Sequence, residues 1–144
     1  MTEPEFFDTN ILLYAKNDDG TAKHKTANDL IRKKIESGDP YISAQVINEF
    51  AVNAIRASHD VSEIEEYLQE ISQTFNVVPL TSADSLAALR IMKRYQFSFW
   101  DSLIVAVALK TGCTTLYTED LQNGQIIDNA LKVVNPFAIK KDEP

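Results

Sequence analysis

The chain has 144 residues, of which 44% are apolar and 24% are charged, and this composition is typical of one globular domain with its own hydrophobic core. The net charge of −7 argues against a surface that coats nucleic acid broadly, although it permits a nuclease whose active-site acids bind metal. The single cysteine, Cys113, excludes an intramolecular disulfide framework.

We expect no signal peptide at the N-terminus and no membrane-spanning segment in the chain. The first residues, MTEPEFF, are acidic where a signal peptide would be basic. The longest apolar run, residues 103–109, is too short to span a bilayer. We therefore expect a cytoplasmic protein with no membrane partner, built as one domain over residues 1–144 with a frayed, charged tail at 139–144.

Strand-like runs and helices alternate along the chain. Five strands are expected, at residues 5–8, 40–42, 77–80, 114–117 and 132–134. Six helices are expected between them, at residues 11–15, 21–37, 43–57, from 60 onward, 81–95 and 99–111. This order predicts an α/β fold in which a short, mainly parallel, five-stranded sheet is flanked by helices.

Residues 97–108, FSFWDSLIVAVA, predict a core helix that begins beside an acid. Ser98 suits the N-cap, which places Asp101 at the third helical position. An acid at that position commonly does no more than stabilise the start of the helix through the helix dipole. A functional role is favoured here because three other acids lie at comparable junctions of the chain.

These four acids are predicted to share one crevice. Asp8 closes the first strand, Asp120 follows the fourth, and Glu49 and Asp101 lie near the N-terminal turns of helices. In a parallel α/β sheet, ligands bind beyond the carboxyl ends of the strands. Like charges in one pocket raise one another's pKa, so we expect a hard divalent cation, Mg²⁺ or Mn²⁺, to bind there. The chemistry indicated is metal-assisted attack of water on a phosphodiester.

Other phosphate chemistries fit the sequence less well. It contains neither G-x-x-x-x-G-K-[ST] nor G-x-G-x-x-G, which excludes the P-loop and Rossmann motifs. A phosphatase of the haloacid-dehalogenase type requires D-x-D after the first strand, and this chain has Asn10 at the third position. No serine stands in a G-x-S-x-G elbow. A metal-dependent phosphatase is therefore disfavoured.

Four segments together resemble the PIN-domain ribonucleases, particularly the VapC-type toxins of bacterial type II toxin–antitoxin pairs. The segments are FFDTNILLYA, QVINEF, FWDSLIVAVAL and LYTEDLQNG. They occur in the family's order and spacing, and the resemblance extends from residue 6 to about residue 136. It implies a PIN-like three-layer sandwich and a Mg²⁺- or Mn²⁺-dependent endoribonuclease activity.

The resemblance also implies roles for individual residues. Asp8 and Asp101 match the principal metal ligands, and Glu49 completes the site directly or through water. Asp120 matches the last acid of the family, with the neighbouring Glu119 as a substitute.

Two threonines complete the set of implied site residues. Thr9 and Thr118 would orient carboxylates or water through their hydroxyl groups. Either Glu49 or Asp120 would help to remove the proton from the attacking water.

The resemblance implies three partners: an RNA substrate, a second copy in a homodimer, and a small cognate antitoxin that covers the acidic site. Two apolar stripes could form such surfaces, one with Ile64, Leu68 and Ile71 and one with Leu89 and Met92. The same stripes could instead face the core of the monomer.

Two questions stay open at the level of sequence. Phe97, Phe99 and Trp100, just before Asp101, could stack an RNA base or pack as the core of a loop. The alternative function is a non-catalytic PIN-like module that binds RNA or protein. The four acids speak against it, because a binding module needs no cluster of mutually repelling carboxylates.

Overall fold

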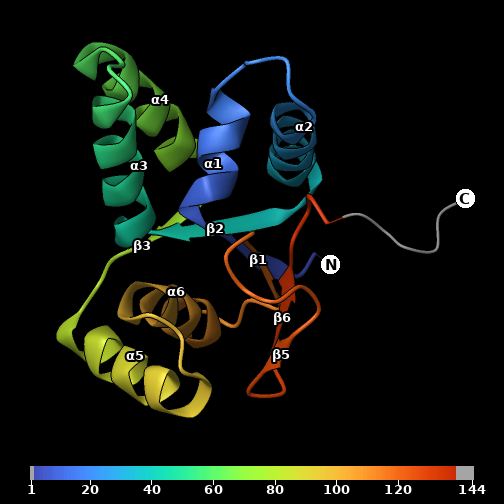
Figure 1. Ribbon diagram of the computed structural model, residues 1–144, viewed down its shortest axis with the longest axis vertical. Coiled ribbons are helices and arrows are strands. Elements are labelled where there is room, and N and C mark those ends of the chain that lie inside the picture. Colours follow the sequence, from blue (N-terminus) through green and yellow to red (C-terminus); the bar gives the residue numbers. More distant parts are fainter. Residues whose placement is uncertain (1, 139–144) are drawn as a thin grey trace, which may run out of the picture.

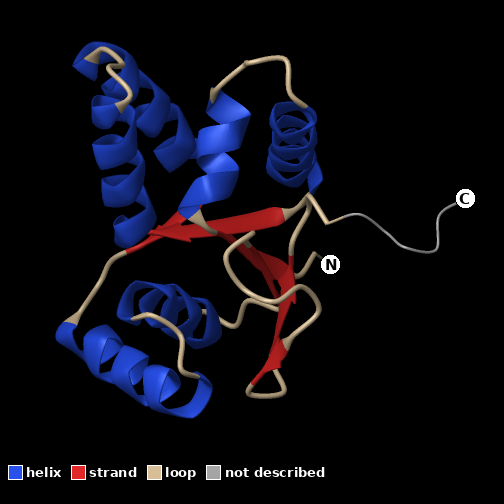
Figure 2. Cartoon of the chain, viewed as in Figure 1, coloured by secondary structure: helices blue, strands red, loops and turns tan. Residues whose placement is uncertain are grey.

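The structure, a computed structural model, describes residues 2–138 and contains one mixed sheet with helices on both sides (Figures 1 and 2). The strands are β1 (Pro4–Phe7), β2 (Asp39–Ser43), β3 (Asn76–Val78), β4 (Thr115–Tyr117), β5 (Ile126–Ile127) and β6 (Leu131–Val134). The helices are α1 (Thr9–Lys16), α2 (Ala22–Ser37), α3 (Ala44–Arg56), α4 (Val61–Thr74), α5 (Ser82–Tyr95) and α6 (Phe99–Lys110).

The strands lie in the order β3-β2-β1-β4-β6-β5, and all neighbouring pairs are parallel except β5 with β6. Helices α1 to α4 lie on one side of the sheet and α5 and α6 on the other (Figure 1). This three-layer arrangement confirms the predicted α/β sandwich with a mainly parallel sheet. The predicted frayed tail at 139–144 lies outside the described residues.

The predicted number of five strands was wrong, because the described part of the sheet has six. The additional strand, β5, is only two residues long and pairs antiparallel with β6. Asp128 and Asn129 follow it with positive φ angles of 52° and 55°, which produces a tight turn back into β6. Two residues are too few to show an alternating apolar pattern, so periodicity could not reveal this strand.

The core lies on both faces of the central strand β1. Phe6 and Phe7 are adjacent in the sequence and both are fully buried, because helices cover each side of the sheet. Helix α6 is apolar on all sides, and every residue from Ser102 to Ala108 is buried. None of the helices within residues 2–138 combines the length and the apolar character needed to cross a membrane.

An ion pair between the buried Asp84 and the exposed Lys110 joins α5 to α6. Asp84 is 3% exposed and accepts hydrogen bonds from the Thr81 backbone N–H at 2.8 Å and from Lys110 Nζ at 2.9 Å. Burial alone would raise the pKa of Asp84, but the bonds from Lys110 and Thr81 outweigh burial and hold the pKa below its usual value. One carboxylate thus caps α5 and anchors it to α6.

Replacing Asp84 should destabilise the fold more than removing the exposed N-cap of α4. We expect Asp84→Ala to lower the free energy of unfolding by about 2 kcal/mol, because Lys110 and the Thr81 N–H lose their buried partner. The control is Asp60→Ala, which removes the exposed cap of α4 and should cost about 1 kcal/mol or less. Urea denaturation measures both, and equal losses would contradict the structural role of Asp84.

Candidate metal centre

Three carboxylates meet at the carboxyl edge of the sheet. Asp8, Asp101 and Asp120 each place an oxygen within 4.8 Å of the others. Glu49, in the second turn of α3, lines the same cleft, which has a volume of about 200 Å³. The structure therefore brings together the four acids that the sequence placed at separate junctions.

Pairing of β1 with β4 fixes the position of Asp8. Phe7 lies opposite Tyr117 in this parallel pair, so Asp8 and Thr118 leave the sheet side by side. The Thr118 hydroxyl donates to Asp8 Oδ2 at 2.7 Å, and the Thr9 backbone N–H donates to Asp8 Oδ1 at 2.7 Å. Asp8 is also the N-cap of α1. Both oxygens of this carboxylate, which is 6% exposed, are thus held in place.

Helices α6 and α3 position the next two acids, Asp101 and Glu49. Ser98 caps α6 by accepting a hydrogen bond from the Asp101 backbone N–H at 3.1 Å, which directs Asp101 from the first turn of the helix. Glu49 accepts a hydrogen bond from the Thr9 hydroxyl at 2.6 Å and one from Gln45 Nε2 at 3.3 Å. The same Gln45 nitrogen donates to the Trp100 carbonyl at 3.1 Å and so ties α3 to the start of α6.

Two neighbouring acids after β4 have separate environments. Asp120 faces the cluster, where Asn10 Nδ2 donates to its carboxylate at 3.0 Å. Glu119 instead accepts hydrogen bonds from the Tyr14 hydroxyl at 2.7 Å and from Lys23 Nζ at 2.8 Å. Burial would raise the pKa of Glu119, but the bonds from Lys23 and Tyr14 prevail and hold it below the usual value. The geometry therefore brings Asp120, and not Glu119, into the cluster.

The cluster is electrostatically unfavourable without a cation. Burial raises the pKa of Asp8 to about 7, although the hydrogen bonds from Thr118 and Thr9 oppose this rise. Burial also raises the pKa of Asp101, and the charges of Asp120 and Glu49 add to the increase in both cases. The centre consequently holds a proton near neutral pH that a bound cation would displace.

The side chains present fit a hard divalent cation. Every ionisable group that lines the cleft is a carboxylate, and oxygen is the ligand that Mg²⁺ and Mn²⁺ prefer. Two further oxygens of the cleft, Asn10 Oδ1 and Gln45 Oε1, are buried with no hydrogen-bond partner within residues 2–138. Unpartnered buried acceptors reduce stability, so the cleft is arranged for a ligand and not for the fold alone.

Sequence reasoning missed the amide side chains of the site. Asn10, Gln45 and Asn53 all line the cleft. Asn10 is two residues after Asp8 and Gln45 is four residues before Glu49, so their spacing from the acids could have indicated them. Amides are common at helix starts and on helix surfaces, so this spacing is a weak signal by itself.

The chain thus combines an α/β sandwich with an acidic, oxygen-lined cleft at the carboxyl edge of its sheet. The sequence model of the PIN domain matches residues 6–126, and the chain therefore belongs to the PIN domain family. This confirms the family resemblance that the four sequence segments indicated. The search of curated proteins gave no match to the chain.

Solved structures share the fold. Mycobacterium tuberculosis VapC20, described as a sarcin-ricin loop cleaving toxin, is 23% identical with a TM-score of 0.67, over 81% of this chain and 91% of that one. A toxin–antitoxin complex from Klebsiella pneumoniae is 21% identical with a TM-score of 0.68, over 94% and 99%. VapBC2 from Rickettsia felis, bound to a promoter DNA fragment, is 17% identical with a TM-score of 0.67, over 92% and 99%.

Ionisation of Asp8 should make stability depend on pH. The pKa of Asp8 is about 7 in the folded protein, against the ordinary value of 3.8 that applies to the unfolded chain. Between pH 4 and 7 the folded protein therefore retains a proton that most of the unfolded chains have released. The free energy of unfolding should therefore fall as the pH rises through this range. In chelator at pH 8, Asp8→Asn should be more stable than wild type by roughly 2 kcal/mol.

Urea denaturation at pH 4, 6 and 8 measures this effect. The Asn variant keeps the capping geometry, and its advantage should be smallest at pH 4, close to the unfolded pKa of 3.8, where a large part of the unfolded population keeps the proton. Asp101→Asn is the matched control and should show a smaller gain in the same direction, because Asp101 is less buried. An advantage that does not change with pH would show that the charge of Asp8 is not the cause.

Proposed function

We propose that this protein is a Mg²⁺- or Mn²⁺-dependent endoribonuclease that acts in the cytoplasm as the VapC-type toxin of a toxin–antitoxin pair. The observation that carries the proposal is the convergence of Asp8, Asp101 and Asp120 within 4.8 Å on a PIN-family fold. Structures that share this fold include one described as a toxin that cleaves the sarcin-ricin loop, which supports RNA as the substrate.

The electrostatics favour an enzyme over the alternative, a module that only binds. A carboxylate whose pKa is raised to about 7 by burial costs stability in the absence of a cation. A module that binds RNA through its phosphates would gain nothing from this cost, since the cluster repels phosphate. In metal-dependent hydrolysis, the same acids are needed to bind the cation.

The division of roles follows from how each carboxylate is held. Asp8, Asp101 and Asp120 would hold the cation, which when bound supplies charge to neutralise the scissile phosphate and to lower the pKa of an attacking water. Glu49 stands at the rim with hydrogen bonds from two neutral groups, Thr9 and Gln45. It is therefore placed to accept the proton from the attacking water. Thr9 orients Glu49 as Thr118 orients Asp8.

The proposal includes two protein partners, a second copy of the chain and a small antitoxin. Helix α5 exposes Leu86, Leu89 and Met92, an apolar stripe that a second copy of the chain could cover. Ile64 and Ile71, also candidates from the sequence, are buried against the core and are not available for contact. A small antitoxin is supported by the fold's likeness to toxins solved as toxin–antitoxin complexes.

Cleavage of RNA should depend on the cluster and not on acids beside it. With Mn²⁺ or Mg²⁺, the purified protein should cut a pool of structured RNAs, and chelator should stop it. Asp120→Asn should lower the cleavage rate at least about 100-fold, because the cluster loses one of its charges. Glu119→Gln should retain the rate within a few-fold, since Glu119 is bonded to Tyr14 and Lys23 outside the cluster.

The variants Asp120→Asn and Glu119→Gln control for each other, since each removes one negative charge from the same loop. An equal loss in the two variants would assign the effect to the loop and not to the metal centre. Metal-independent cutting, or no cutting by a folded wild-type protein, would contradict the proposed function.

The α5 stripe should control the oligomeric state. We expect wild type to have twice the 16.2 kDa mass of the chain in light scattering and Leu89→Lys to have the mass of one chain. Because Leu89 is 52% exposed, the melting temperature of the monomeric form should change little. A monomeric wild type, or a dimer that survives the lysine, would remove α5 as the interface.

A further inference from the structure

A groove continues from the acidic cleft along helix α3. It has a volume of about 520 Å³ and shares three lining residues with the cleft, Gln45, Glu49 and Asn53. Its remaining lining residues are Asn48, Val52, Arg56, Leu80 and Trp100. The residues from α3 recur at helical spacing from Gln45 to Arg56, a length of about 16 Å. Apart from Gln45 and Glu49, which also belong to the acidic cleft, the residues of the groove have no part in the proposed hydrolysis.

Trp100 provides an exposed aromatic face at the end of the groove next to the metal centre. Its side chain is 60% exposed, which is unusual for tryptophan. Phe97 and Phe99 pack against the core. Of the two roles that the sequence left open, stacking an RNA base or packing as the core of a loop, these two residues therefore have the second. The hydrogen bond from Gln45 Nε2 to the Trp100 carbonyl fixes the backbone at this point. An aromatic face in water, immediately before Asp101, is a stacking platform for a flat ligand.

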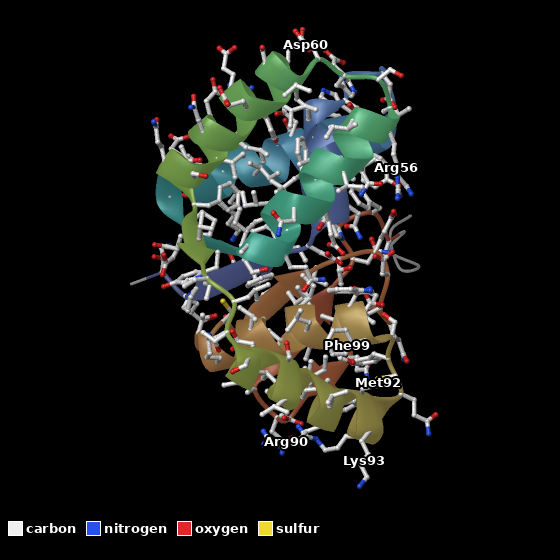
Figure 3. All side chains as sticks on the ribbon, turned by 90° about the vertical axis from the view of Figure 1, so that its left-hand side faces the viewer. Arg56, Asp60, Arg90, Met92, Lys93 and Phe99 are labelled. Carbon is white, nitrogen blue, oxygen red and sulfur yellow. The ribbon has the colours of Figure 1, made fainter. Side chains whose placement is uncertain are left out.

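Arg56 provides a positive charge at the other end. It is exposed and forms no ion pair within residues 2–138. Figure 3 shows Arg56 and Phe99, the neighbour of Trp100, on the same side of the molecule, with Arg90 at the far end on α5. In a chain with a net charge of −7, a guanidinium along a groove that leads to an acidic centre favours an anionic chain over an isolated neutral ligand.

We propose that this groove binds a short unpaired segment of the RNA next to the cleaved bond, with one base stacked on Trp100 and a backbone phosphate further along the segment at Arg56. The inference rests on the proposed function. The aromatic face suits a base of any sequence, the exposed amides of Asn48 and Asn53 offer hydrogen bonds to base edges, and the guanidinium suits a phosphate. The enzyme would therefore select unpaired segments of structured RNA.

The polarity of the groove favours RNA over a second copy of the chain as its occupant. Five of its eight lining residues carry an amide or a charge, and the other three, Val52, Leu80 and Trp100, are apolar. The α5 stripe, in contrast, presents three neighbouring apolar side chains. Interfaces between protein copies are depleted of charge at their centres, so the groove is the less suitable of the two surfaces.

Trp100 is the only tryptophan in the sequence, so its fluorescence reports on the groove alone. We would titrate the protein with a randomised, unstructured RNA tetranucleotide in Ca²⁺, under conditions checked to give no cleavage. Stacking of a base should quench the fluorescence in a saturable manner. A fluorescence change caused by dilution of the protein without RNA would show that a second copy covers Trp100, and it would overturn the proposal.

Variants test the same contacts through the affinity of a dye-labelled tetranucleotide, measured by anisotropy. Trp100→Leu should weaken binding about ten-fold or more, while Trp100→Phe should stay within a few-fold of wild type because it retains an aromatic face. Arg56→Gln should weaken binding and reduce the slope of log affinity against log salt by about 0.7. The matched control, Arg90→Gln, removes an exposed arginine on α5 and should leave binding unchanged.

The possible failures of the two proposals differ. Metal-dependent RNA cleavage with unquenched fluorescence, and with Trp100→Leu binding as wild type does, would overturn the nucleotide subsite and leave the ribonuclease in place. A folded wild type that neither binds nor cleaves RNA would overturn both. Thermal unfolding of each variant verifies that it folds, and the exposure of Trp100 and Arg56 predicts that all of them do.

Discussion

The central constraint on this molecule is the burial of one carboxylate beside three others. Asp8 is fixed by hydrogen bonds from Thr118 and Thr9 where two parallel strands end together, and burial raises its pKa to about 7. Turning the Asp8 side chain away from the other acids would break the cap of α1 and the hydrogen bond from Thr118. The fold thus maintains a centre that a divalent cation would stabilise, and the stability of the protein and its proposed chemistry depend on the same group.

Neutral side chains surround the acidic centre, and positively charged side chains lie away from it. Neutral groups, the hydroxyls of Thr9 and Thr118 and the amides of Asn10 and Gln45, hold the acids without reducing their negative charge. Groups of positive charge are kept apart, since Lys23 is paired with Glu119 and Arg56 lies at the end of the groove along α3. In the proposed enzyme the cation would neutralise the scissile phosphate, while the groove would distinguish one RNA segment from another.

Much of the fold and of the acidic centre could be predicted from the sequence, because both follow from rules about strand ends. Asp8 and Asp120 each follow a short apolar run, and Asp101 follows a good N-cap, so a parallel sheet had to bring them to one edge. What could not be predicted depends on tertiary contacts. Whether Glu119 or Asp120 faces the centre is decided by Tyr14 and Lys23, which lie about a hundred residues earlier in the chain. Likewise, no pattern in the sequence predicts the two-residue strand β5 or the exposure of Trp100.

A calorimetric titration of the metal-free protein with Mn²⁺ tests the central claim most directly, in two buffers of different ionisation enthalpy near pH 6. Because Asp8 carries a proton at that pH, with a pKa of about 7, binding should release about one proton, and the affinity should rise with pH until it levels off near pH 7. Asp101→Asn should weaken this binding strongly. Binding with no proton release, or equal binding by the Asn variant, would contradict a metal centre built around the buried Asp8 carboxylate.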